Sequence, residues 1–333
     1  MKNQNFFSTI ALSIALTMLA GGASAQQLAP IEYNAGQLVE MAVTGEISPP
    51  SVRDTVYRVE ADGTVSFMPG VGSITYNFRT GDTAVHMAGN HVEPAVSLYN
   101  LGADGDRASS ESRALNALSQ IGNRATVITG DAKGAQGRVI GKHGGAEHVM
   151  VDFDSDVFDD LVIGDQMQIR AHGAGMQLLN VEGVKVMNTS PDLLEALNAA
   201  GAGITAEGRL RIGVSHRVPA KIMGSGLGRD QTYTGDYDIQ LFDSQTVEEY
   251  GLETLRYGDI VAIIDADSSY GRIYRQGAMT IGVVSHGRSE SAGHGPGVTT
   301  LLTSTVGNID AFIDPKANLA VLLGIRDDVT FDR

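Results

Sequence analysis

The sequence predicts a mainly β protein of the α+β kind, organised as two domains that include a small barrel and two short helices. Short apolar runs rich in Val, Ile and Thr recur along the whole chain, as strands require. Most of these runs are bounded by Gly, Asp or Asn, which favour turns. The 333 residues also include 41 glycines, a number that suits many tight connections between strands.

The first 25 residues have the pattern of an export signal. Lys2 supplies a short charged start, an apolar run follows, and Ala23, Ser24 and Ala25 form a small-x-small cleavage site. The apolar run is too short to span a bilayer comfortably, so we expect a cleaved signal peptide over residues 1–25 rather than a membrane anchor. The sequence therefore predicts a soluble mature protein that is periplasmic or secreted.

The net charge and the lack of cysteine limit the kinds of molecule that this protein is expected to bind. The net charge is −15, and losing Lys2 with the signal makes it −16. Nucleic acid and anionic lipid both attract basic surfaces, so we expect no nucleic-acid partner and no membrane partner after cleavage. The sequence has no cysteine, which excludes disulfides and thiolate metal ligands. A small polar molecule is the expected partner, and a homo-oligomer is left open.

Two segments have the pattern of a capped helix. Residues 109–122 and 190–201 each begin with a serine that can cap the first turn, carry leucines on one stripe and end at a glycine. Other segments favour strands, and the domain boundary is expected just after the second helix. The prediction is an N-terminal β-rich domain over residues 26–201 and a C-terminal β-rich domain over residues 202–333.

One stretch of the N-terminal half resembles the KOW element of ribosomal and transcription-factor barrels. Residues 130–153 read as a glycine turn, a strand, a loop and a second strand, which implies an SH3/KOW-like small barrel. The acidity of the chain opposes RNA binding by this element. Lys142 is interpreted as a solvated turn residue. His143 and His148 are candidates for a pocket, His143 because two glycines follow it and allow close approach.

Two further phrases place carboxylates beside other polar groups. His91 and Glu93 stand two residues apart and would share one face of a strand, where they can bind a metal or form an acid/base pair. Asp236 and Asp238 have the same spacing and follow a glycine-rich loop around Ser225, whose backbone N–H groups can bind an anion. The alternatives are a hydrogen-bonded structural histidine and a solvated strand edge.

The run HGRSESAGHGPG places two histidines in one polar loop. His286 ends a predicted strand and His294 comes just before the next one, so both can face the same space at the strand ends. We expect them to line one pocket with Asp236 or Asp238, because a carboxylate near an imidazole fixes its tautomer and raises its basicity. The alternative is a solvated hairpin loop.

Several long phrases together resemble the bacterial and archaeal family known as domain of unknown function 4438. They include GNHVEPAVSL, VPAKIMGSGLG, TGDYDIQ and AGHGPGVTTLLTS, and the likeness covers residues 45–325. The resemblance implies a β-rich fold with N- and C-terminal domains and supplies no reaction. The family's first phrase often reads GDHVEPG; Asn90 and Ala95 differ here, so a ligand role for that first carboxylate does not carry over. A fainter likeness, limited to an Asp-Ile pair and a Gly-Asp turn, points to the acetamidase/formamidase family.

Two functions fit these observations. The first is a hydrolase of a small polar substrate, an amide being one candidate, assisted by a divalent metal ion. In this hypothesis Asp236, His286 and His294 are catalytic, and His91, Glu93 and Asp238 hold the metal. The second is a non-catalytic β-rich protein that binds a ligand or another subunit. Convergence of these side chains in one pocket would favour the enzyme.

Overall fold

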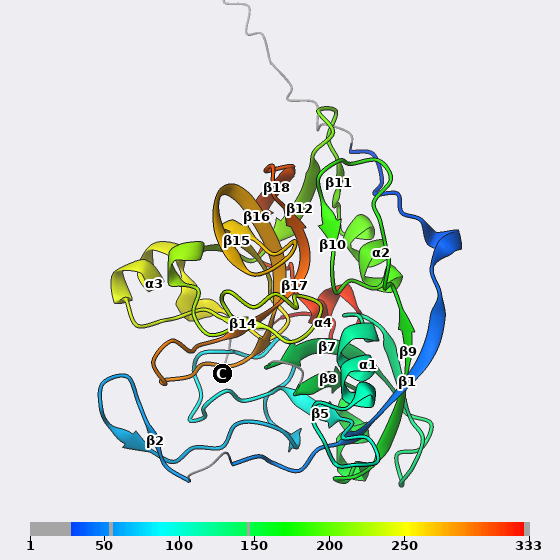
Figure 1. The fold of residues 1–333 in the computed structure, drawn as a ribbon, viewed down its shortest axis with the longest axis vertical. Helices are drawn as coiled ribbons and strands as arrows, with labels where there is room; N and C mark the ends of the chain where they lie inside the picture. Colours follow the sequence, from blue (N-terminus) through cyan, green and yellow to red (C-terminus); the bar gives the residue numbers. More distant parts are fainter. Residues whose placement is uncertain (1–27, 53–55, 145–146, 330–333) are drawn as a thin grey trace, which may run out of the picture.

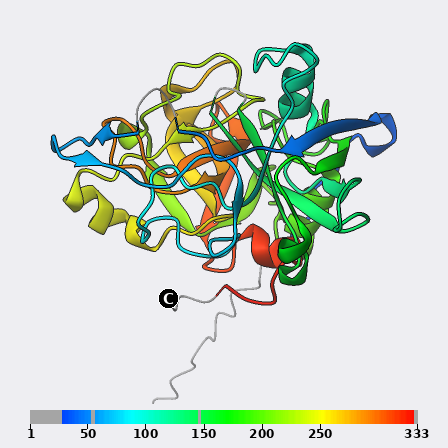
Figure 2. The same cartoon turned by 90° about the horizontal axis from the view of Figure 1, so that it is seen from below.

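The computed structural model describes residues 28–52, 56–144 and 147–329 of the chain. The predicted signal peptide, residues 1–25, lies outside the described residues. Within the described part, no helix is long and apolar enough to cross a membrane. The fold is mainly β, as predicted, and Figures 1 and 2 show its two largest sheets lying side by side.

The first of these is a closed antiparallel barrel of six strands, which confirms the predicted small barrel. In order around the barrel, the strands are β1 (Glu40–Ile47), β9 (Gln166–His172), β6 (Arg124–Val127), β7 (Gln136–His143), β8 (His148–Asp152) and β5 (Ala95–Tyr99). The barrel closes because β1 pairs with both β9 and β5, with Glu46 opposite Tyr99 in the second pairing. A short strand, β4 (Ile74–Thr75), continues the sheet beyond β5.

The second sheet has six strands and comes mostly from the C-terminal half. Its strands are β10 (Lys185–Val186), β17 (Gly297–Ser304), β16 (Ile273–His286), β15 (Ile260–Asp267), β13 (His216–Pro219) and β14 (Tyr237–Asp238). All its pairs are antiparallel except β13 with β15. Smaller sheets are formed by β11 (Gly203–Ile204), β12 (Leu210–Val214) and β18 (Ile309–Ile313), and by β2 (Arg58–Val59) and β3 (Val65–Ser66).

Both predicted helices are present. In α1 (Ser110–Leu118) the Ser109 side chain accepts a hydrogen bond from a first-turn N–H, and Ser190 caps α2 (Pro191–Ala199) in the same way. Two further helices were not predicted, namely α3 (Ser244–Tyr250) and α4 (Leu319–Leu322). Short 3₁₀ segments are η1 (Ala35–Gln37), η2 (Ser155–Asp160), η3 (Ala220–Ile222) and η4 (Leu252–Thr254).

The barrel and the second sheet share one apolar core. Val139 of β7 and Leu301 of β17 belong to the same buried cluster. Strand β15 is buried on both faces: Ile260 and Ala262 face this shared core, whereas Val261 and Ile263 face a second one. Close packing of β7 against β17 therefore fixes the barrel relative to the sheet.

Lys142 lies at this junction, and the expectation of a solvated turn residue was wrong. The residue belongs to β7 and is 0% exposed. Its Nζ donates hydrogen bonds to Asn188 Oδ1 at 2.7 Å and to the Tyr233 carbonyl at 2.9 Å. Burial lowers the pKa of Lys142 to about 7. The side chain therefore joins segments of the two sequence halves instead of facing water.

Candidate metal centre

Five of the eight histidines and three carboxylates gather where the barrel meets the second sheet. Each is placed by the end of a strand or by a loop beside one. The N-terminal half contributes His91 and Glu93 from the loop before β5, His143 at the end of β7 and His148 at the start of β8. The C-terminal half contributes Asp236 and Asp238 at β14, His286 at the end of β16 and His294 from the following loop.

Glu93 lies beneath the cluster, with 0% exposure. Its Oε1 accepts hydrogen bonds from Nδ1 of His143 and, at 2.9 Å, from Nδ1 of His148. Its Oε2 accepts hydrogen bonds from the Gly72 N–H and the Ser97 hydroxyl. Because a carboxylate accepts hydrogen bonds here, each imidazole carries hydrogen on Nδ1, and in the neutral ring the Nε2 lone pair is available to a ligand.

Asp236 and His286 face each other without a hydrogen bond. Asp236 Oδ2 and His286 Nε2 lie 2.7 Å apart, yet within the described residues neither atom has a hydrogen-bond partner of acceptable geometry. The other polar atoms are occupied, since the Gly144 N–H donates to Asp236 Oδ1 and His286 Nδ1 donates to the Gly287 carbonyl. Both residues are buried, at 5% and 0% exposure. This pair requires a proton or a cation between two electron-rich atoms.

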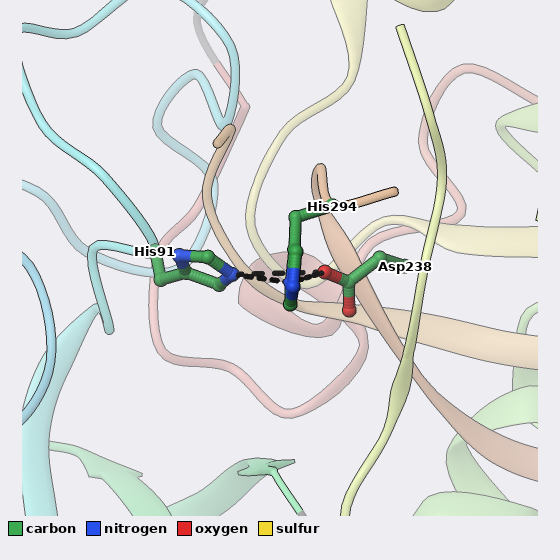
Figure 3. Close-up of side chains that lie close together, drawn as sticks. All are labelled: His91, Asp238 and His294. Atoms are coloured by element: carbon green, nitrogen blue, oxygen red, sulfur yellow. Dashed lines mark hydrogen bonds and ion pairs between the residues drawn. The ribbon is translucent and has the colours of Figure 1, made fainter. Parts of the chain in front are cut away.

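A second group lies beside the first one. Figure 3 shows His91, Asp238 and His294 pointing toward one another from three separate segments. His294 Nδ1 is 3.0 Å from Asp238 Oδ2 and 2.9 Å from His91 Nε2. His91 Nδ1 donates to Asn90 Oδ1 at 2.6 Å, which leaves its Nε2 with a lone pair. Asn90 therefore orients His91.

The backbone at His91 supports a special role for this residue. Its φ is +56°, in the left-handed region that costs a non-glycine residue about 1 kcal/mol or more. The segment is a loop instead of the strand considered from the sequence, so His91 and Glu93 do not share a strand face. A hydrogen bond from the His91 N–H to the Arg288 carbonyl, 3.0 Å, holds the conformation.

The charges of the cluster are strongly perturbed. Burial lowers the pKa of His91 to about 4, so this ring is neutral at pH 7. Burial acts to lower the pKa of His286, but the charge of Asp236 outweighs it and holds that pKa well above its ordinary value. Burial acts to raise the pKa of Asp238, but contacts with the neighbouring histidines outweigh it and hold that pKa well below its ordinary value. Such opposing shifts are typical of functional sites.

The cluster opens into a pocket of about 260 Å³. Its walls include the predicted residues His91, His143, Ser225, Asp236, Asp238 and His294. His286 lies behind the wall, and His148 lies beneath it on Glu93. Sequence reasoning missed Arg58, Glu147 and Arg229, which also line the pocket. For Glu147 the available signal was its place directly before His148 in the KOW-like stretch.

The structure thus brings all the predicted site residues into one region, while the catalytic or metal role given to each stays a prediction. Three sets of donor atoms each lie within 4.8 Å of one another and could hold a metal ion. The sets are His91, Asp238 and His294; Glu93, His143 and His148; and His143, Asp236 and His286.

Fold and site together define a β-barrel protein with a buried histidine–carboxylate centre shared between its two halves. The chain belongs to the family described as domain of unknown function (DUF4438): the N-terminal model matches residues 57–195 and the C-terminal model matches residues 201–323. It is also similar to a solved structure titled "Crystal structure of TM1086", with 43% sequence identity and a TM-score of 0.80. That match covers 87% of this chain and 98% of the other. No curated protein matches the chain.

Proposed function

We propose that the protein is an exported, metal-dependent hydrolase of a small polar substrate that carries a negative charge. The observation that carries the proposal is the buried pair Asp236 Oδ2 and His286 Nε2, 2.7 Å apart without a hydrogen bond among the described residues. Donor atoms bound to one cation at about 2.0–2.2 Å lie about 3 Å apart, close to the spacing seen here. An ion pair with protonated His286 would have this spacing as well. What favours a metal ion is the lack of hydrogen-bond geometry between the two buried atoms.

The donor atoms indicate the kind of metal. Imidazole nitrogens and carboxylate oxygens together suit Zn²⁺, Mn²⁺, Co²⁺ or Fe²⁺, whereas Ca²⁺ and Mg²⁺ prefer sites made of oxygen alone. Glu93 supports this assignment, because metal-binding histidines usually donate their other N–H to a carboxylate. His143 makes that contact with its Nδ1, so its Nε2 is the atom available to the metal.

The chemistry needs a proton carrier besides the metal. A divalent cation polarises a carbonyl and lowers the pKa of water. Hydrolysis then joins the water oxygen to the carbonyl carbon and breaks the C–N bond, and a water proton passes to the leaving nitrogen. Glu147 lines the pocket and belongs to none of the three donor sets. We assign it the role of carrying that proton.

The pocket also indicates the charge of the substrate. Arg58 and Arg229 line it together with the cluster, so two cationic residues border the space in which a substrate would lie. Guanidinium groups bind carboxylates with paired hydrogen bonds. A volume of about 260 Å³ suits a small molecule. An amide that bears a carboxylate, such as an N-acyl amino acid, has both features.

The test begins with the metal content of purified protein, followed by assays of the Mn²⁺- and Zn²⁺-loaded forms against a panel of N-acyl amino acids and related amides. We expect Glu147→Gln to keep the metal and to lower kcat by at least ~100-fold, because proton transfer contributes about that much. Glu248→Gln, an exposed position on α3, is the control and should change neither. Protein that binds no metal would refute the proposal, and bound metal without turnover of any amide would favour the non-catalytic binding function.

A further inference from the structure

Asp238 presents its two oxygens to different histidines. Its Oδ1 lies 3.6 Å from His286 Nε2. Its Oδ2 lies 3.0 Å from His294 Nδ1 and 3.7 Å from His91 Nε2. Asp238 is 4% exposed, and its Oδ2 also accepts a hydrogen bond from the Gly295 N–H at 3.2 Å. A carboxylate placed in this way has one oxygen for each of two neighbouring positions.

The donor atoms on either side of Asp238 form two separate sets. The first set is His143, Asp236 and His286, and the second is His91, Asp238 and His294, with each set's ligand atoms within 4.8 Å of one another. The two sets share no residue. They are nonetheless adjacent, because the rings of His91 and His286 have centroids 5.2 Å apart. Two-metal hydrolytic sites hold their cations about 3.5–4 Å apart, so two neighbouring donor sets are the arrangement that such a centre needs.

The third set does not add another cation position. Four donors already occupy the oxygens of Glu93: Nδ1 of His143, Nδ1 of His148, the Gly72 N–H and the Ser97 hydroxyl. A carboxylate offers about four lone-pair directions, so Glu93 has none left for a metal. Its role is to orient the two imidazoles.

We infer that the centre holds two divalent cations bridged by Asp238, one bound by His143, Asp236 and His286 and the other by His91 and His294. This inference rests on the proposed function for the presence of metal and adds the number of ions and the bridging residue. The first position is enclosed, since His286 is 0% exposed, whereas the side chain of His294 is 36% exposed toward the pocket. The second cation is therefore the more exchangeable one and the one that contacts substrate.

The test counts cations and detects their proximity. Metal-free protein titrated with Mn²⁺ should bind two ions per chain in two steps, and the electron paramagnetic resonance spectrum at two equivalents should show exchange coupling between the ions. His294→Ala should reduce the count from two to one and abolish the coupling, while the tighter first step persists. His86→Ala, an exposed histidine outside the cluster, is the control and should still bind two coupled ions.

The outcomes separate this inference from the proposed function. One Mn²⁺ per chain with amide hydrolysis intact would overturn the second cation and leave the hydrolase standing. Two coupled ions without hydrolysis of any amide would support the centre and count against the hydrolase, and no bound ion would overturn both. If His294→Ala does not fold, as judged by circular dichroism, the stoichiometry and coupling of the wild-type protein decide the matter.

Discussion

Gly297 is the residue on which the first cation position depends most closely. A Cβ atom at this position would lie 2.0 Å from Asp236 Oδ2 and 2.2 Å from His286 Nε2. Both neighbours are the proposed ligand atoms of buried residues, and real Cβ atoms do not come that close. Glycine is therefore required here by the space that Asp236 and His286 occupy.

We predict that Gly297→Ala displaces this pair and weakens binding of the first cation by about 10–100-fold, in line with the effect of disturbing ligand geometry. The measurement is a Mn²⁺ or Zn²⁺ titration of metal-free protein. Gly36→Ala is the control, because a Cβ there meets no atom within 4 Å, and it should bind metal like wild type. Unchanged affinity in Gly297→Ala would contradict the assignment of Asp236 and His286 as ligands.

At the residue scale, the sequence predicted which residues lie in the site better than it predicted which residues contact one another. His286, His294, Asp236 and Asp238 lie at strand ends in the C-terminal half, where local pattern could find them. Glu93 could not be linked to its partners, because His143 and His148 are 50 and 55 residues away and meet it only when the barrel closes. Lys142 was mispredicted for the same reason, since it packs against Tyr233 and Thr299 of the other half.

At the scale of elements, α2 is tied to the barrel through its first turn. Asp192 lies in that turn and pairs with Arg138 of β7 and, at 3.4 Å, with Arg124 of β6. Burial acts to raise the pKa of Asp192, but the hydrogen bond and charge of Arg138 outweigh it, so the pKa is lowered from 3.8. A negative charge at a helix N-terminus is also stabilising. The carboxylate thus fixes the helix against two strands.

The corresponding prediction concerns the pH dependence of stability. Because the folded-state pKa is depressed, the contribution of Asp192 is present above pH 3.8 and is lost as pH falls through the folded pKa. Asp192→Asn should cost about 1 kcal/mol or less at pH 7, given that the pair is partly exposed, and about nothing near pH 2. Urea unfolding at both pH values measures this, with exposed Asp160→Asn as control. An equal cost at both pH values would show that charge is not the cause.

Helices with complete caps could be predicted, and short ones could not. Both α1 and α2 have a serine cap and two turns of apolar spacing, so local sequence is sufficient. In contrast, α3 has seven residues and α4 has four, too few for a periodic pattern to emerge. Strand β16 extends over fourteen residues and includes Gly277 and Gly282.

At the scale of the whole molecule, the mainly β class and the barrel could be predicted, but the order of strands could not. Closure requires β1 to meet β9, so that Glu40 lies opposite His172, a pairing that no local pattern encodes. The parallel pairs β13 with β15 and β12 with β18 also join segments that are far apart in sequence. Each depends on cores assembled from distant segments.

Export is the prediction that belongs to the complete chain. The charged start, apolar run and small-residue site lead us to expect cleavage after Ala25. Expression of the full chain in a Gram-negative host, followed by mass spectrometry of the periplasmic fraction, should give a mature protein beginning at Gln26. Intact protein that keeps Met1 and stays in the cytoplasm would contradict it.

Each cation set draws its donors from both halves of the chain: His143 joins Asp236 and His286, and His91 joins Asp238 and His294. A ligand that binds only the joined form favours that form by mass action. Bound metal would therefore stabilise the contact between the barrel and the second sheet. Removing the metal with a chelator should weaken this contact before the barrel or the sheet unfolds. Neither half of the chain alone contains a complete set of ligands for either cation. A gene fragment encoding one half would carry a β scaffold and an incomplete set of ligands.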